Sequence, residues 1–465
     1  MNSPITLPVV TIQPTLQTVL DDVRSGLVIN EDIWISCYRL GSTSVHGKVR
    51  LSLNEKDRSQ VSLDARDGVE INSLGGSSYT VACPSLSIAP TRIAFPRQTF
   101  SDPDRADPHH PQQISAFDVS PDGTQIATGY NDGTIFLSPA TSVSRTSANA
   151  DSAKLSCKPH LTTVTSLQFF PSSRVLLSAG ADFMLHILPA EAADGESATS
   201  DAPSFKPVRT LKAHTRYITS TAMVSRGRNV LSSAKDSTVR LWDVSGGQQI
   251  RAMWSSRFVP INSMAVGEKA EFQAVATVDP DGENESPPKP AQLDPREVDT
   301  VGKVVFCALQ DGEFEAFDLS TKNSVFHSSS EGTGKRPPLT SIAYSPTSNL
   351  LATGSSRGVI TVYDTRNLSS PVTSFTRNGS SIESLAFVVP SSLKFSGSGT
   401  QEGELGLAIG TEDGLPYVTE VRPEGPEVVA ELVGGDCEAV RVVRVRGEGG
   451  GEVWTAGDDG IVRKY

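Results

Sequence analysis

Three residue types of a hydrolytic triad, His214, Ser232 and Asp236, stand within a short stretch of the chain, and Trp242 follows them. A serine hydrolase requires a Ser hydroxyl exposed on a strained turn, a His base, an orienting Asp and donors for the oxyanion. Ser232 instead lies in a stretch that reads as an alternating strand, with no GxSxG motif around it. We therefore expect no hydrolytic centre at Ser232 and no enzyme activity from this chain.

The spacing of these residues is repeated along the chain. An aliphatic residue follows His214 by four positions and Asp236 follows it by twenty-two, and the same register recurs in two earlier sets: His110 with Thr128 and Asp132, and His160 with Ser178 and Asp182. Because no enzyme needs three triads at a fixed period, we interpret the set as a structural brace. In such a brace the Trp242 indole donates to the Ser232 hydroxyl. That hydroxyl donates to His214, which donates to Asp236, so every buried polar group is paired.

The elements that must position these residues are short strands. Each unit reads as strand, turn and strand between the His and the Asp, and a third strand such as TVRLWD follows the Asp. Four weaker copies follow, and they begin with INSMAVG (261–267), LTSIAYS (339–345), IESLAFV (382–388) and AVRVVRV (439–445). Seven units of about forty residues with a Trp-Asp ending are typical of a WD-repeat propeller. We therefore predict an all-β fold, a seven-bladed WD-repeat β-propeller with a small N-terminal module.

The repeat pattern also predicts the domain boundaries. The N-terminal module is expected over residues 1–77, with a short helix near 14–24, and the propeller over 78–465, with repeats from about residue 110. The last unit ends on its third strand, so its outer strand has to come from elsewhere. We predict that SYTVACP (78–84) supplies it, because a closing strand removes an exposed sheet edge. Three segments rich in Gly, Pro, Ser and acidic residues are predicted to be loops: 190–205, 279–299 and 391–406.

Composition limits the remaining functions. The formal net charge of −12 gives no general attraction to nucleic acid or anionic lipid, and no apolar run is long enough to span a membrane. The five cysteines are scattered without a CxxC pair, which indicates reduced thiols of an intracellular protein. His109 and His110 lack Cys or carboxylates at ligand spacing, and no phosphate-binding glycine loop occurs. We therefore expect no metal and no cofactor.

Function is expected on the loops of a binding platform. In a propeller, the loops that enter the first strand and those that join the second strand to the third lie on one face. On that face the third unit carries Arg216 and Tyr217. The last two units carry four acidic residues, Glu412, Asp436, Glu438 and Asp458. These acids are either ordinary solvated loop charges or an acidic sector for a basic protein surface, with Tyr217 as an aromatic anchor.

Six stretches of the chain resemble one family of WD-repeat proteins. They are WISCYRLGSTSVHGKV (34–49), FFPSSRVLLSAGAD (169–182), RGRNVLSSAKDSTVRLWD (226–243), INSMAVG (261–267), ELVGGDCEAV (431–440) and DGIVRKY (459–465). They are similar to the proteasomal ATPase-associated factor family, the WD-repeat chaperones of proteasome regulatory-particle assembly. The resemblance implies a non-enzymatic factor that binds the C-terminal region of an ATPase subunit while the base is assembled. The acidic insertion and the longer N-terminal segment depart from the family pattern, so no family contact is carried over there.

Partner and location follow from the same resemblance, and one rival class stays open. We expect a monomer that binds a protein partner in the cytoplasm and nucleus. The alternative is a substrate receptor of a cullin-type ubiquitin ligase, because Tyr363-Asp364-Thr365-Arg366 resembles the Trp-Asp-x-Arg ending with which such receptors dock onto their adaptor. An Asp-x-Arg after a third strand is also common in WD repeats that have no such role.

Overall fold

The computed structural model describes most of the chain: residues 3–54, 60–75, 78–102, 105, 110–140, 155–190, 205–269, 294–328, 336–389, 405–422, 425–446 and 451–465. Among these residues there is a single α-helix, which is too short to cross a membrane, and the other regular elements are strands and short 3₁₀ turns. The chain separates into two compact units. The first unit contains residues 1–111, 357–360 and 373–465, and the second contains 112–356 and 361–372.

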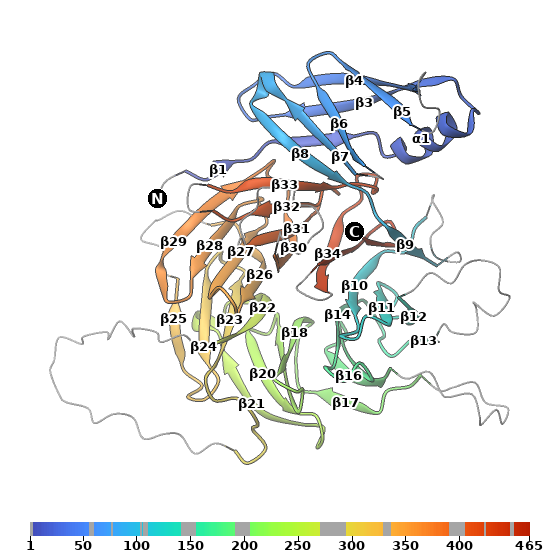
Figure 1. Cartoon of the computed structure of the whole chain (residues 1–465). Helices are drawn as coiled ribbons and strands as arrows, with labels where there is room; N and C mark the ends of the chain where they lie inside the picture. The colour runs from blue at the N-terminus through green and yellow to red at the C-terminus, as the bar shows by residue number, and fades with distance from the viewer. Residues whose placement is uncertain are drawn as a thin grey trace, which may run out of the picture. The chain divides into compact units, whose positions relative to one another are not determined.

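The N-terminal module, in the first unit, consists of one helix and two sheets (Figure 1). Its helix α1 (Leu16–Ser25) follows β1 (Ile5–Thr6) and ends where Gly26 takes the left-handed conformation, with φ 77°. The first sheet has the order β2 (Val9–Ile12), β3 (Asn30–Tyr38), β4 (Val45–Leu53), β5 (Val61–Arg66). The second sheet portion has the order β6 (Glu70–Gly75), β7 (Ser78–Cys83), β8 (Ile88–Ala94) and continues from β8 into β33 (Glu427–Leu432) as part of one seven-stranded sheet; the 3₁₀ turn η1 (Pro84–Leu86) joins β7 to β8.

One core unites the helix and both sheets of this module. The apolar side chains of α1 recur with helical spacing, so Leu16, Val19, Leu20 and Val23 all face that core. Alternation along β3 buries Ile35 and Cys37 in the same core and leaves Trp34 and Tyr38 exposed. The predicted helix near residues 14–24 is therefore confirmed as part of a folded module.

Four complete blades lie in the second unit, each a four-stranded antiparallel sheet. Blade 1 has β10 (Ile114–Val119), β11 (Gln125–Tyr130), β12 (Ile135–Pro139) and β13 (Leu155–Cys157). Blade 2 has β14 (Val164–Phe169), β15 (Val175–Gly180), β16 (Met184–Pro189) and β17 (Arg209–Lys212). Blade 3 has β18 (Ile218–Val224), β19 (Asn229–Ala234), β20 (Thr238–Asp243) and β21 (Gln248–Trp254), followed by the 3₁₀ turn η3 (Ser256–Phe258). Blade 4 has β22 (Ile261–Glu268), β23 (Lys303–Leu309), β24 (Phe314–Asp318) and β25 (Ser324–His327).

Three further blades complete the repeats. Blade 5 has β26 (Leu339–Ser345), β27 (Leu350–Ser355), β28 (Ile360–Asp364) and β29 (Asn367–Thr376), and β1 adds a parallel strand at the end of β29. Blade 6 has β30 (Ile382–Val388), β31 (Gly406–Thr411), β32 (Tyr417–Glu420) and β33 (Glu427–Leu432). Blade 7 has β34 (Val440–Arg446), β35 (Glu452–Gly457), β36 (Ile461–Lys464) and β9 (Gln98–Ser101). With these seven blade sheets in the described residues, the fold is the predicted all-β, seven-bladed WD-repeat β-propeller with an N-terminal module.

Two local features recur in the register that the sequence repeats define. Every first strand carries a β-bulge just after its first residue, in blade 1 between Ile114 and Ala116 and in blade 7 between Val440 and Val442. The Asp after each second strand, except in blade 5, accepts a hydrogen bond from the backbone N–H two residues on, as Asp132 does from Thr134 at 3.0 Å. The sequence period therefore corresponds to a repeated backbone structure.

The predicted closing strand is wrong. Residues 78–84 contain β7, which pairs with β6 and β8 inside the N-terminal module. The fourth strand of blade 7 is β9, whose Gln98 pairs with Lys464 and Ser101 with Ile461. The module also extends beyond residue 77, because β7 and β8 contribute to its core. The strand β8 in addition pairs in parallel with β33 of blade 6, with Ala94 opposite Leu432. Of the three predicted loops, residues 191–204, 279–293 and 391–404 lie outside the described residues.

Candidate functional site

The four brace residues of blade 3 form one hydrogen-bonded chain. The Trp242 Nε1–H donates to Ser232 Oγ at 2.8 Å, and Ser232 Oγ donates to His214 Nε2 at 2.7 Å. The Nδ1–H of His214 donates to the Asp236 carboxylate at 2.9 Å. Strands β19 and β20 and the loop before β18 position these groups, and Ser232 is fully buried. Because its hydroxyl is saturated and shielded from solvent, it cannot attack a substrate.

The Asp236 carboxylate also fixes the loops around it. It accepts the backbone N–H of Thr215 at 3.0 Å and the Thr238 hydroxyl at 2.6 Å. Burial alone would raise the pKa of this carboxyl, but the hydrogen bonds from His214, Thr238 and Thr215 hold it well below its usual range. Burial lowers the pKa of His214, against the raising effect of Asp236. The brace is therefore a neutral imidazole beside a charged carboxylate, a structural rather than a catalytic arrangement.

Blade 2 carries a second brace without the indole. His160 donates from Nδ1 to Asp182 at 3.0 Å and its Nε2 meets Ser178 Oγ at 3.0 Å, while Leu188 stands where blade 3 has Trp242. The third predicted brace is not of this kind, because His110 is exposed, unlike the buried His160 and His214. Asp132 remains a turn residue that accepts from Thr134. The spacing alone thus identified the turn but not the burial of the His.

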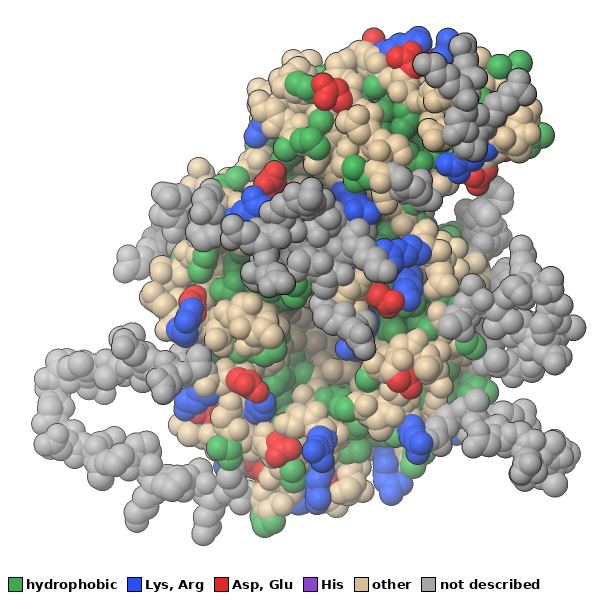
Figure 2. All heavy atoms as spheres, in the orientation of Figure 1, with side chains coloured by type: hydrophobic (Ala, Val, Ile, Leu, Met, Phe, Trp, Pro, Cys, Tyr) green, Lys and Arg blue, Asp and Glu red, His purple; other side chains and the backbone are tan. Residues whose placement is uncertain are grey.

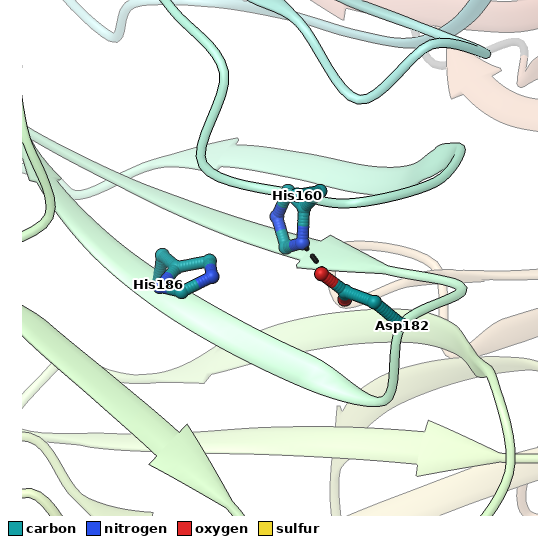
Figure 3. A group of neighbouring side chains, drawn as sticks. All are labelled: His160, Asp182 and His186. Carbon is teal, nitrogen blue, oxygen red and sulfur yellow. Dashed lines mark hydrogen bonds and ion pairs between the residues drawn. The ribbon is translucent and has the colours of Figure 1, made fainter.

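A possible metal-binding group in blade 2 is better explained by the same brace. His160, Asp182 and His186 each offer a ligand atom within 4.8 Å of the others, and Figure 3 shows the two rings beside one another. Both nitrogens of His160 are already hydrogen-bonded. His186 is buried, its Nδ1 meets Thr210 Oγ1 at 3.0 Å, and burial lowers its pKa to about 4. A metal would have to break the hydrogen bonds that hold the blade together.

Three of the four acidic candidates are exposed, and the fourth is buried in an ion pair. Glu412, Asp436 and Glu438 are exposed, and none of them has an ion pair with another described residue. Asp458, in contrast, is buried, and it accepts a bidentate bond from Arg441, with Nη2 at 2.7 Å. Asp458 is therefore wrong as a partner-binding candidate, because its charge is neutralised inside the blade.

The exposed acids are brought together by a close contact between two loops of the first unit. A Cβ on Gly414 would lie 2.6 Å from the carbonyl carbon of Cys437 and 2.7 Å from the carbonyl oxygen of Glu438. The loop of Glu412 thus touches the loop of Asp436 and Glu438, and only glycine fits at the contact. We call Glu412, Asp436 and Glu438 the acidic loop pair. On the face drawn in Figure 2, acidic side chains are interspersed with Lys and Arg.

The remaining candidates are surface residues of the second unit. Arg216 and Tyr217 are exposed in the loop before β18, and Lys235 Nζ lies 5.7 Å from the centroid of the Tyr217 ring. Arg366 is exposed as the ligase motif would require, but its guanidinium is paired with its neighbour Asp364, with Nη2 at 2.6 Å.

One exposed aromatic residue, Phe183, was not among the site residues predicted from the sequence. Phe183 has φ 69°, in the turn position that Gly133 occupies in blade 1 and Gly312 in blade 4. A bulky residue rarely adopts this left-handed conformation. Alignment of the repeats would have revealed the missing glycine, whereas the exposure of Phe183 required the structure.

Comparison with known proteins agrees with this architecture. The family model described as "WD domain, G-beta repeat" matches residues 102–137, 152–187, 205–243 and 327–364, on blades 1, 2, 3 and 5. Protein HIRA of Oryza sativa subsp. japonica is 26% identical over 147 residues, which make up 30% of this chain and 15% of that protein. WD-repeat proteins are in general scaffolds rather than enzymes. The matched repeats and the blade sheets together identify the chain as a WD-repeat protein.

Proposed function

We propose that this chain is a protein-binding chaperone that holds the C-terminal region of a proteasomal ATPase subunit during assembly of the regulatory-particle base. The observation that carries the proposal is the acidic loop pair, three exposed carboxylates on two loops in contact, none of which forms an ion pair with another described residue. The sequence stretches shared with the proteasomal ATPase-associated factor family supply the identity of the client. One of those stretches begins with WISCY at the end of β3, and another contains GGDCE (434–438), which includes Asp436 and Glu438 of the acidic loop pair. The proposal includes a monomer located in the cytoplasm and nucleus.

The geometry of the acidic loop pair suits a basic client. Cys437 lies between Asp436 and Glu438 and has φ 51°, so the backbone at the centre of this loop is held in a sparsely populated conformation. The Gly414 contact holds the neighbouring loop against it. Carboxylates that are positioned before binding lose little conformational entropy when a Lys or Arg approaches, which favours both affinity and rapid association.

Charge reversal of the acidic loop pair tests the proposal. We would replace Glu412, Asp436 and Glu438 with Lys, express tagged full-length protein, and recover partners from cell extract. The expected result is recovery of free regulatory-particle ATPases, without core-particle subunits, by the unchanged protein and a loss of about tenfold or more in the variant. The matched control is replacement of Asp21, Asp67 and Glu70, exposed acids of the N-terminal module, with Lys.

Two outcomes of the same recovery experiment would contradict the proposal. Equal recovery of ATPases by the acidic-loop variant and by the control variant would show that the client binds elsewhere. Recovery of a cullin ligase adaptor in place of the ATPases, with its loss in Arg366→Ala, would favour the receptor function instead.

A further inference from the structure

Five exposed apolar side chains gather on one set of loops in the second unit. We call Leu161, Phe183, Tyr217, Trp254 and Phe258 the apolar arc; their exposed fractions are 81%, 42%, 43%, 54% and 71%. Leu161, Tyr217 and Phe258 lie in loops that precede a first strand, and Phe183 lies in a turn between a second and a third strand. Trp254 ends β21 and pairs with Thr238, the first residue of β20. All five therefore lie at the same ends of the strands in blades 2 to 4.

Contacts between neighbouring loops hold the apolar arc in place. The Leu161 N–H donates to Asp182, the residue before Phe183, at 3.1 Å. Ser237, in the turn beside Lys235, donates to the Phe258 carbonyl oxygen at 2.6 Å. The rings of Trp254 and Phe258 meet edge to face, with centroids 5.8 Å apart. These side chains are thus presented to solvent by ordered loops.

The backbone of the apolar arc is strained where it presents its side chains. Phe183, Arg257 and Phe258 have φ values of 69°, 58° and 55°, in the left-handed region that favours glycine. Glycine occupies the position of Phe183 in blades 1 and 4, so the fold does not require a bulky residue there. Large side chains kept in a costly conformation and exposed to water indicate a role outside folding.

Basic residues surround the apolar arc although the whole chain is acidic. Lys158, Arg216 and Arg257 are exposed in the same loops, and the exposed Lys212 is the last residue of β17, at the same ends of the strands. Three acidic side chains of these loops are engaged: Asp182 and Asp236 turn their carboxylates to His160 and His214, and Glu313 pairs with Arg257 at 3.0 Å. Asp311, in the turn between β23 and β24, is half-buried and accepts the backbone N–H of Glu313. Lys158, Lys212 and Arg216 therefore supply exposed positive charge beside the arc, whereas Arg257 is paired with Glu313.

We propose that the apolar arc and its basic rim bind an extended acidic peptide segment of a partner protein. Apolar side chains of the segment pack against Tyr217, Trp254 and Phe258, and its carboxylates pair with Arg216 and the neighbouring basic residues. A segment from another protein is favoured because the longest insertions of this unit join β12 to β13, β16 to β17 and β22 to β23, at the opposite ends of the strands. This surface is independent of the acidic loop pair and of its basic client.

Peptide selection tests the proposal while the partner protein is still unidentified. A library of random twelve-residue peptides displayed on phage is selected on immobilised full-length protein, and enriched peptides are synthesised with a fluorescent label. We expect enriched peptides to combine Asp or Glu with aromatic or aliphatic residues. Their affinity, measured by fluorescence anisotropy, should fall about tenfold or more in the Trp254→Ala, Phe258→Ala double variant and in Arg216→Glu.

Two further variants separate binding from folding. Phe258→Gly relieves the left-handed strain, so it should keep or raise the melting temperature while it weakens the peptides, a combination that a merely structural residue would not give. Val208 and Val301 are similarly exposed and lie at the opposite ends of the strands. Val208→Ala and Val301→Ala should bind the peptides with unchanged affinity.

Three outcomes would overturn the proposal: enrichment of basic peptides or of no common sequence, equal affinity in the arc variants and the valine variants, or tighter binding of a twelve-nucleotide oligothymidine than of any selected peptide. ATPase recovery by the charge-reversed acidic-loop variant is measured separately. The failure of one proposal is therefore distinguishable from the failure of the other.

Discussion

The loops of blades 2 and 3 and the loops of blades 6 and 7 connect strands of the same four-stranded arrangement, but different side-chain interactions hold them in place. In blades 2 and 3 a buried imidazole joins a Ser hydroxyl to an Asp carboxylate. In blade 7 the guanidinium of Arg441 joins Asp458 to Glu383, and beside blade 6 the buried Arg377 pairs with Glu431. The repeat therefore accepts either a neutral imidazole or a charged guanidinium as the group that holds its loops; we call the first the neutral brace and the second the ionic brace. In both cases the acidic residue that holds a loop is not available to bind a partner.

The largest expected effect comes from breaking the neutral brace. Asp236→Ala should lower the free energy of unfolding by about 3 kcal/mol, because His214, the backbone N–H groups of Thr215 and Thr238 and the Thr238 hydroxyl all lose a charged acceptor. Urea unfolding measures the change. Asp311→Ala removes only the turn hydrogen bond of blade 4 and should cost about 1 kcal/mol. An equal loss in the two variants would contradict the brace.

The ionic brace should give a somewhat smaller effect. Arg441→Met leaves the buried Asp458 and the half-buried Glu383 without their shared cation, at a cost of roughly 2 to 3 kcal/mol in the free energy of unfolding. Arg366→Met removes an exposed pair with Asp364 and should cost less than about 0.5 kcal/mol. If both variants unfold at the same urea concentration, the Arg441 cluster does not hold the loops of blade 7.

The blade 2 brace should make stability depend on pH. Burial lowers the pKa of His186 to about 4, whereas an unfolded His titrates at about 6.5. Between these values the unfolded chain binds more protons, so stability is lost as the pH falls. The contribution of His186 from pH 7 to pH 5 is about 2 kcal/mol. The pKa values of Asp182 and Asp236 are lowered, so those carboxyls act only below this window.

Urea unfolding at both pH values checks this prediction. His186→Leu should unfold with a weaker pH dependence than the unchanged protein, because it removes one buried base. His214 remains in the variant, and the lowered pKa of its ring acts in the same direction, so part of the dependence should persist. A pH dependence identical in the two proteins would contradict the assignment to His186.

The smallest stability effect is expected from the acidic loop pair. Replacement of Glu412, Asp436 and Glu438 with Lys should change the free energy of unfolding by less than about 0.5 kcal/mol per residue, because the three side chains are exposed and form no ion pair within the part of the chain that the structure describes. Thermal unfolding followed by circular dichroism measures this. A large loss would show that these acids stabilise the fold, as Asp458 does, and would remove the basis of the proposed client site.

Local sequence was sufficient for much of this architecture. The interval from His214 to Asp236 predicted a strand, a turn and a second strand, and the same interval correctly located the brace of blade 2. Backbone hydrogen bonds and turn residues act over a few positions, so the repeat period carries this information. The period failed at His110, where the Asp of the turn is kept but the His is exposed.

The errors concern partners that are distant in the chain. Residues 78–84 and 98–101 are both extended segments between turns, and nothing local shows which of them pairs with β36. The choice is made by long-range packing, since Tyr79, Val81 and Cys83 contribute to the core of the N-terminal module. In the same way, the sequence predicts both Asp436 and Asp458 as exposed loop acids. The structure distinguishes them, because Arg441 pairs with Asp458 and not with Asp436.

The sequence by itself determined the number of repeats, the register of their strands, the Asp turns and the polar composition of the blade 3 brace. These depend on spacing and on residue types that are close in the chain. The tertiary structure decided which strand completes blade 7, which acids remain free and which aromatic side chains stay exposed. Those outcomes depend on burial and on pairing between residues far apart in the chain. The free energy of each such contact is weighed against that of the alternative pairings, so no local sequence pattern predicts which pairing forms.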